Sequence, residues 1–301
     1  PTIPPRWRNA IWHFTKERHE DMLSAALNHK KRTPLTKLST MIRFTIATVC
    51  YNAGHLIGRT IKSVESQNHP GVEHLIIDGN SQDETLALIH FYQQRNSLAT
   101  VQHEIVCRSE PDNGIYDAMN KALQLATGDY ILFLNAGDKF HSSTVLSDIA
   151  AQLEGYTERK RRPAVLYGHT DIVDRNGHFV AHRRLAPPEK LSWKSFKHGM
   201  LVCHQAFFAR IDLARKYPYD LEKYHLSADF DWCIRIMKEA ERLKLPLRHT
   251  QLIVADYLEG GVSTQHHKDS LLERYDIMCH HYGKLTAILQ HFYFIFRSAV
   301  K

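Results

Sequence analysis

The stretch SEPDNGIYDAMNKALQLATGDYILFLNAGD, from Ser109 to Asp138, decides the fold of this chain. An acidic loop at 110–114 precedes a helix-forming run at 115–126, and Gly128 is expected to end that helix. The apolar run at 130–134 is short and rich in β-forming residues, so it predicts a buried strand that leads to the carboxylate of Asp138. Because open α/β sheets bind ligands beyond the carboxyl ends of their strands, we expect a ligand site at this edge.

In the surrounding chain, from residue 43 to about 153, segments with a strand-like pattern of apolar residues alternate with segments with a helical pattern. Strands are predicted at 44–51, 72–77, 101–108 and 130–134, and helices at 56–67, 82–94 and 115–126. Ser81 would cap the second of these helices, with Asp83 and Glu84 in its first turn. This order predicts an α/β fold with a mostly parallel, doubly wound sheet and helices on both faces.

The second half of the chain is less regular. It predicts a strand at 164–168, a hairpin of 170–173 with 178–183 across Asn176-Gly177, a helix from Ser227 to Glu241 and a last strand at 252–258. The first forty residues differ in composition, so we expect an N-terminal extension at 1–40 with an amphipathic helix over 7–27. Residues 266–301 are predicted to form a helical C-terminal segment.

Charge and cysteine content exclude several classes of protein. The 39 basic and 32 acidic side chains give a formal charge of +7, which fits a protein that handles phosphates or lies near an anionic membrane. No nucleic-acid-binding motif is present, so we expect no nucleic-acid partner. The five cysteines include no CxxC pair, which indicates reduced thiols in a cytoplasmic protein. No signal peptide and no apolar run of about 20 residues is visible, so no segment is expected to span a membrane.

Four aspartates fall at predicted strand ends or in loops: Asp78, Asp112, Asp138 and Asp229. Carboxylates at the ends of parallel strands converge on one edge of the sheet, which is the usual binding crevice. The first two could also be ordinary turn residues, and Asp229 could be a helix cap. Asp138 is harder to explain structurally, because so apolar a strand needs no carboxylate at its end.

These segments resemble a known family. Residues 48–52, the run IIDGNSQDET at 76–85 and the stretch 110–138 are similar to the nucleotide-binding half of family 2 glycosyltransferases, which have the GT-A fold. Three shorter matches extend the similarity to about Ser263: HQAFF (204–208), SADFDW (227–232) and GGVST (260–264). The branch most similar is the bacterial, WcaE-like one that builds colanic acid and other exopolysaccharides. The resemblance implies a GT-A domain at 41–265, with a nucleotide-binding half at 41–153 and an acceptor half at 154–265.

The resemblance assigns six residues to the nucleotide: Thr48, Val49, Tyr51, Asp78, Asp112 and Lys121. The end of the first strand, 48–51, would line the base pocket. Asp78 would bind the nucleoside at its base or ribose, and Asp112 would help to hold the base. Lys121, on the helix that follows Asp112, would face the same site.

The resemblance assigns the chemistry to two aspartates. Asp138 matches the last acidic residue of the family's metal motif and implies Mg²⁺ or Mn²⁺, while Asp229 matches the catalytic base. The family pattern at this strand is rich in Asp, whereas this chain reads Asn135-Ala136-Gly137-Asp138, so one carboxylate is left for the ion. Contacts with the acceptor or the diphosphate are expected from three further residues: His204, Gln205 and Asp231.

The implied activity is the transfer of a sugar from a nucleotide sugar, with UDP expected as its nucleotide, to a hydroxyl of a glycan or lipid-linked acceptor. A base on one side and a metal-bound leaving group on the other predict inversion at the anomeric carbon. The pathway implied is bacterial surface polysaccharide synthesis. An alternative is a catalytically inactive nucleotide-sugar-binding or scaffold protein. Nucleotidyltransferases and Rossmann dehydrogenases are disfavoured, because no Gly-rich phosphate loop follows the first strand.

The last predicted helix, LTAILQHFYFIFRSAV at 285–300, is aromatic and flanked by basic residues. Such a helix can lie in a membrane interface, and it can equally pack on its own domain or in a dimer contact. The first alternative would place the protein peripherally on the inner face of the cytoplasmic membrane, close to a lipid-linked acceptor.

Overall fold

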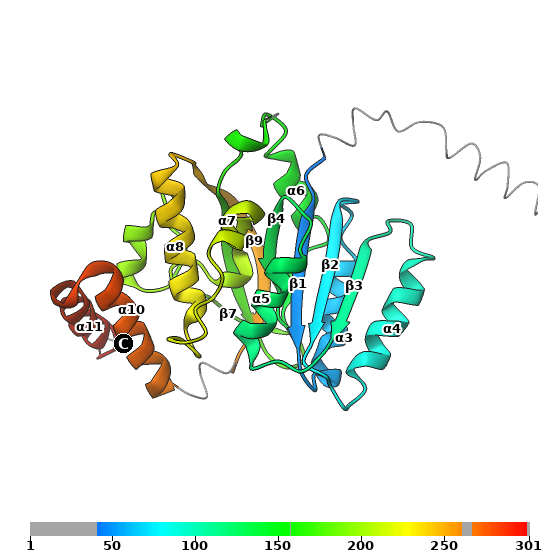
Figure 1. Cartoon of the computed structure of the whole chain (residues 1–301), viewed down its shortest axis with the longest axis horizontal. Helices are drawn as coiled ribbons and strands as arrows, with labels where there is room; N and C mark the ends of the chain where they lie inside the picture. The colour runs from blue at the N-terminus through cyan, green and yellow to red at the C-terminus, as the bar shows by residue number, and fades with distance from the viewer. Residues whose placement is uncertain (1–40, 157, 261–266, 300–301) are drawn as a thin grey trace, which may run out of the picture. The chain divides into compact units, whose positions relative to one another are not determined.

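The computed structural model describes residues 41–156, 158–260 and 267–299. The chain from Ile42 onward forms one compact unit (Figure 1). Its first part contains β1 (Phe44–Cys50), α3 (Gly54–Glu65), β2 (Val72–Asp78), α4 (Thr85–Asn96), β3 (Glu104–Ser109), α5 (Ile115–Leu125), β4 (Tyr130–Phe133), β5 (Lys139–Phe140) and α6 (Val145–Ala151). The remainder contains η1 (Arg159–Arg161), β6 (Val165–Val173), β7 (Phe179–His182), η2 (Trp193–His198), η3 (His204–Ala206), β8 (Phe207–Arg210), α7 (Ile211–Lys216), α8 (Ala228–Arg242), β9 (Leu247–Leu258), α10 (His267–Tyr282) and α11 (Lys284–Ala299).

The described strands form one sheet in the order β3-β2-β1-β4-β8-β6-β9-β5, and β7 pairs with β6. The first four strands are parallel, and in register Cys50 lies opposite Asp78 and Asp78 lies opposite Ser109. Their carboxyl ends therefore meet at one edge of the sheet, as the alternating sequence pattern predicted.

The rest of the sheet is mixed. Strand β8 runs antiparallel to both β4 and β6, β6 and β9 are parallel, and β5 is antiparallel to β9. The predicted α/β class is confirmed, with the parallel character confined mainly to the first half. The hairpin across Asn176-Gly177 is present, with Gly177 at φ +87°, but the two strands predicted before it form the single strand β6.

Helices cover both faces of the sheet, as expected for this fold class. Val49 and Ile77 pack on one face in a cluster that also holds Met119 of α5 and Trp232 of α8. Their neighbours Cys50 and Ile76 lie in a separate cluster with residues of α3 and α4. Successive residues of a strand point to opposite faces, so one apolar run serves both layers.

Two local predictions were wrong. Gly128 does not cap α5, whose C-cap is Ala126; a Cβ at Gly128 would lie 2.7 Å from the backbone nitrogen of Thr45, so close approach to β1 requires glycine there. Ser81 does not cap α4, which begins at Thr85 after Glu84. The helix expected at 7–27 and most of the GGVST motif lie outside the described residues.

The predicted C-terminal helical segment contains α10 and α11, which contact each other around Gly283 at φ +85° (Figure 1). Helix α10 also contacts α8. Among the residues that the structure describes, no helix is long and apolar enough to cross a membrane.

Candidate active site

The carboxylate of Asp78 organises the loops at the ends of β2 and β3. The residue is fully buried, and its oxygens accept hydrogen bonds from the Ser81 backbone nitrogen (3.0 Å), the Ser81 hydroxyl (2.5 Å) and the Ser109 hydroxyl (2.6 Å). A buried carboxylate is stable only when such donors replace water. Asp78 therefore fixes the shape of this edge of the sheet.

The loop after β1 interlocks with the loop after β2. The Asn52 backbone nitrogen donates to the Ser81 hydroxyl (2.8 Å), and the Asn52 side chain accepts from the Gln82 nitrogen (2.9 Å). Asp83 accepts from the Gly54 nitrogen at the start of α3 (2.9 Å). Asn52 has φ +46°, a left-handed conformation that asparagine tolerates better than most residues. The two loops thus form one rigid rim.

Tyr51, Gly79 and Asp112 come together on this rim. A Cβ at Gly79 would lie 2.6 Å from Asp112 Oδ2 and 3.3 Å from Tyr51 Cδ2, so glycine lets the Asp112 side chain come this close without moving aside. The Tyr51 side chain is 64% exposed, and its ring is available for stacking. Lys121 donates to the Pro111 carbonyl (2.7 Å) and so braces the Asp112 loop.

Two residues predicted to line the base pocket have buried side chains. The Thr48 hydroxyl donates to the Leu134 carbonyl (2.9 Å), and Val49 belongs to the apolar core. Both lie in the last three residues of β1, which is buried along its whole length. Among residues 48–51, only Tyr51 has an exposed side chain.

Asp138 is buried at the turn after β4. Its Oδ2 accepts from Gln205 Nε2 (3.0 Å) and its Oδ1 from the Leu258 nitrogen (2.9 Å). Burial raises the pKa of this carboxyl, and the hydrogen bonds from Gln205 and Leu258 offset only part of that effect. The hydroxyl of Thr60 in α3 bonds to the carbonyl of Asp138 (2.7 Å) and holds the turn.

Asp229, in the first turn of α8, is held by two side chains. His204 Nδ1 lies 3.0 Å from its Oδ2, and the Tyr116 hydroxyl donates to its Oδ1 (3.1 Å). Burial acts to raise the pKa of Asp229, but the bonds from His204 and Tyr116 outweigh burial and hold it below its usual value. The carboxylate is therefore ionised at neutral pH.

The consecutive residues His204 and Gln205 link the two aspartates. His204 contacts Asp229 and, through Nε2, the amide nitrogen of Asn135 (3.2 Å), while Gln205 contacts Asp138. The single turn η3 thus brings the end of β4 and the start of α8 to one place. Sequence reasoning gave these two residues only a weak role with the acceptor or diphosphate, and it missed Tyr116 altogether.

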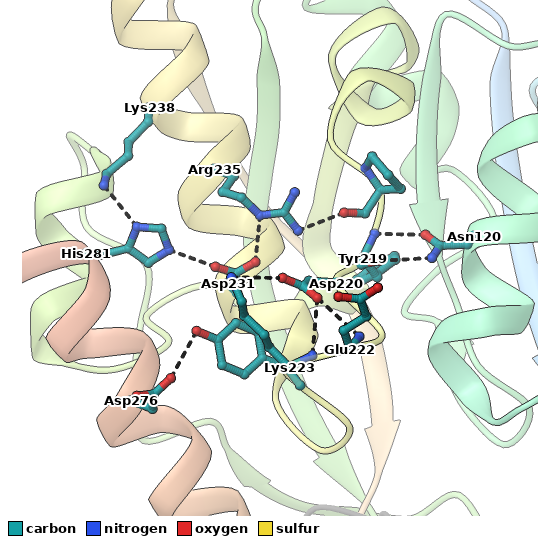
Figure 2. A network of polar contacts seen from close by, with 12 residues as sticks. Asn120, Tyr219, Asp220, Glu222, Lys223, Asp231, Arg235, Lys238, Asp276 and His281 are labelled. Atoms are coloured by element: carbon teal, nitrogen blue, oxygen red, sulfur yellow. Dashed lines mark hydrogen bonds and ion pairs between the residues drawn. The ribbon is translucent and has the colours of Figure 1, made fainter.

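Asp231 points away from this site. It is almost fully buried, and its oxygens bind Arg235 Nε (2.6 Å) and His281 Nε2 (2.8 Å), as Figure 2 shows. Burial would raise the pKa of Asp231, but His281 and Arg235 lower it below the usual value. Its carboxylate binds α10, which leaves it no room for the predicted contact with acceptor or diphosphate.

A second group of acidic side chains lies across β5, β9 and β6. His141 Nδ1 is 2.7 Å and Lys139 Nζ 2.8 Å from Asp256, and His182 Nδ1 is 2.8 Å from Asp171. Each carboxylate thus has a cationic or hydrogen-bonding partner within the chain. A cavity of about 270 Å³ beside Asp171 and His182 contains none of the predicted site residues.

Comparison with known proteins identifies the family. Residues 45–217 match the model of glycosyl transferase family 2, which covers more than half of the chain. The chain therefore belongs to this family, and it is a glycosyltransferase.

Two relatives with similar sequences are glycosyltransferases of different biosynthetic systems. A PGL/p-HBAD biosynthesis glycosyltransferase of Mycobacterium bovis is 30% identical over 222 residues, which are 73% of this chain and 78% of the relative. The amylovoran biosynthesis glycosyltransferase AmsB of Erwinia amylovora is 28% identical over 65% of this chain and 64% of the relative. They support the family and its role in glycan biosynthesis, without singling out the colanic acid branch.

Solved structures share the fold at low sequence identity. The S. aureus TarS fragment 1–349 in complex with UDP-GlcNAc has a TM-score of 0.60 at 16% identity and covers 78% of this chain and 65% of that one. The whole TarS chain is matched over only 38% of its length. The mannosyltransferase PcManGT of Pyrobaculum calidifontis, in complex with GDP-Man and Mn²⁺, has a TM-score of 0.53 at 13% identity and covers 81% of this chain and 64% of that one.

Proposed function

We propose that this glycosyltransferase inverts the anomeric carbon as it moves a sugar from a UDP-sugar to a hydroxyl of a glycan or lipid-linked acceptor. One observation carries the proposal: the buried Asp138 and the partly buried Asp229, whose pKa values shift in opposite directions, are joined through consecutive residues of η3. Carboxylates whose environments differ in this way suit different roles in one reaction.

The nucleotide would bind on the rim made by Tyr51, Gly79 and Asp112. The exposed ring of Tyr51 can stack on a base, and Asp112 can accept hydrogen bonds from base or ribose. Asp78 supports the rim, and it can reach a nucleoside only by exchanging one of its serine partners. Lys121 supports the Asp112 loop from α5.

Asp138 and Asn135 fit a Mg²⁺ or Mn²⁺ ion. Asn135 Oδ1 is buried and has no hydrogen-bond partner among the described residues, and amide and carboxylate oxygens are the donors that these ions prefer. The second oxygen donor of the turn therefore comes from an amide where the family pattern has a carboxylate. When bound, the ion would supply positive charge that stabilises the departing nucleoside diphosphate.

Asp229 would take the proton of the acceptor hydroxyl. The acceptor oxygen then bonds to the anomeric carbon while the bond from that carbon to the diphosphate oxygen breaks, and the proton stays on the Asp229 carboxylate. His204 and Tyr116 hold that carboxylate in place from either side. Attack from the side opposite the leaving group inverts the configuration.

The proposed setting is bacterial exopolysaccharide synthesis, to which the colanic acid branch and amylovoran both belong. We place the enzyme peripherally on the inner face of the cytoplasmic membrane. Helix α11 supports this placement, since its exposed apolar side chains recur at helical spacing: Leu285, Leu289, Phe292, Ile295 and Phe296.

A transfer assay tests the proposal. Purified protein with Mn²⁺ is incubated with UDP-, GDP- and dTDP-linked sugars and a panel of alkyl glycosides, and the product is examined by proton NMR. We expect transfer from one class of donor, with a β linkage from an α-linked donor. A retained configuration would exclude the single displacement at Asp229.

A further inference from the structure

Three consecutive backbone nitrogens just before α8 are held by one carboxylate. Glu273 of α10 accepts hydrogen bonds from the nitrogens of His225 (2.9 Å), Leu226 (2.8 Å) and Ser227 (2.8 Å). Hydrogen bonds to an ionised acceptor are about twice as strong as neutral ones. The segment that leads into α8 is thus fixed from outside.

Helix α8 has no cap of its own. Ser227 occupies the N-cap position, but its side chain makes no capping bond and instead contacts Ser270 Oγ of α10 (3.0 Å). The first nitrogens of a helix lack partners within it, and the positive end of the helix dipole favours a nearby carboxylate. Glu273 supplies such a charge next to this end of the helix. It binds the nitrogens of residues 225–227, and the last of these, the N-cap Ser227, lies two residues before Asp229.

Three further contacts attach α10 to the same region. The Tyr224 hydroxyl lies 3.3 Å from Asp276, and Asp231 binds His281 Nε2 at 2.8 Å (Figure 2). Lys238 Nζ lies 2.9 Å from the other nitrogen of His281. Asp231 and His281 are both buried, so breaking the bond between them would leave buried polar atoms without this partner.

We propose that Glu273 is a positioning residue for the reaction, because it sets where the start of α8 presents Asp229 to the acceptor. The proposal rests on the proposed function, in which Asp229 takes the proton. Among the described residues no hydrogen bond joins Asp229 to α10, although the charge of Arg274 in α10 helps to lower the pKa of Asp229. Glu273 acts through the backbone of 225–227. The position of the proposed base is thus determined by α10 as well as by the sheet.

The test compares Glu273→Ala, Glu273→Gln and the control Glu241→Gln. Glu241 lies at the other end of α8, where it accepts from Trp193 Nε1 (2.7 Å). Displacing a catalytic group by about 1 Å can cost roughly 100-fold in rate. We expect Glu273→Ala to lower kcat by about that factor while KM for the donor stays within about twofold. Glu273→Gln loses the charge and keeps one of the two accepting oxygens, so it should restore only part of the rate, and Glu241→Gln should match the wild type.

A second readout does not depend on activity. In protein labelled with ¹⁵N-histidine, the Nδ1–H of His204 should be protected in the wild type and in Glu241→Gln, and it should exchange rapidly in Glu273→Ala. Unchanged kcat and unchanged His204 signals in folded Glu273→Ala would overturn the proposal. If the wild type transfers no sugar but the His204 signal still depends on Glu273, the proposed function fails while the positioning role stands.

Discussion

The two halves of this protein hold their acidic side chains in different ways. In the first half, Asp78 is held by Ser81, three residues away, and by Ser109, 31 residues away on the adjacent strand. In the second half, Asp229 is held by His204, 25 residues away, and by Tyr116, 113 residues away. The rim proposed for the nucleotide is thus a local structure, whereas the carboxylate proposed as the base depends on several distant elements at once.

This difference has a consequence for mutations. Changes on the rim should alter donor binding and leave the chemical step intact, because the rim is closed by its own loops. Changes around Asp229 should alter the rate and leave donor binding intact. Variants of each half should therefore differ in whether donor binding or the rate of transfer changes.

Asp229→Asn should nearly abolish transfer. An amide cannot take the acceptor proton, and general base catalysis contributes typically 10²- to 10⁴-fold, so we expect kcat to fall by about 1,000-fold. Stabilisation by the donor, measured as the shift in Tm, should remain because the rim is unchanged. Transfer at the wild-type rate would show that Asp229 is not the base.

Asp138→Ala should remove the part of donor binding that depends on metal. We expect donor affinity in Mn²⁺ to fall by about tenfold or more, as it does when a metal site loses a carboxylate ligand or its support. Affinity without metal should stay close to that of the wild type, as measured by calorimetry with and without EDTA. Equal affinities in both proteins with Mn²⁺ would contradict the role of Asp138.

The rate should persist to unusually low pH. Asp229 must be ionised to act, and its pKa lies below the usual aspartate value of about 3.9, so kcat at saturating Mn²⁺ should fall only below that pH. The metal must be saturating because the pKa of Asp138 is raised, and protonation of that carboxylate would weaken metal binding at a higher pH. His204→Gln removes the imidazole bond that lowers the pKa, and the acid limb should move to higher pH. Circular dichroism at each pH controls for unfolding. If the acid limb of the wild-type pH–rate profile had its midpoint near pH 6.5, the usual pKa of histidine, His204 would instead be identified as the base.

The smallest expected effect concerns α11. Phe292→Glu places a charge among the exposed apolar side chains of α11, and it should reduce binding to vesicles containing anionic lipid while leaving transfer to a soluble acceptor unchanged. Phe91→Glu on α4 is the matched control, since Phe91 is also exposed and lies on a different helix. Equal binding of both variants in vesicle sedimentation would favour a packing role for α11.

The sequence predicted the strands and helices of residues 44–134 well because their signals are local. The alternation of strand and helix, and the acidic groups at 78, 112 and 138, follow from periodicity and turn chemistry over a few residues. The errors there were also local: the cap of α4 depends on Ser81 turning back to Asp78, and Gly128 serves contact with β1.

The environment of Asp229 could not be predicted in the same way. Tyr116 lies within a helix whose buried face looks like ordinary core, and Glu273 lies in a helix with no distinctive motif. Their roles follow from tertiary contacts across 113 and 46 residues. The sequence of α8 even offers a cap residue, Ser227, and only the structure shows that its side chain makes no capping bond.

The most direct test of the account is the thermal stability of the wild type with a panel of nucleoside diphosphates and sugar nucleotides, each with and without Mn²⁺. A ligand that binds only the folded state raises Tm. We predict a shift with one class of nucleotide, UDP, that grows when Mn²⁺ is present and is lost in its metal-dependent part in Asp138→Ala. No shift with any sugar nucleotide, or the same shift with and without metal, would contradict a donor site built on the rim and Asp138.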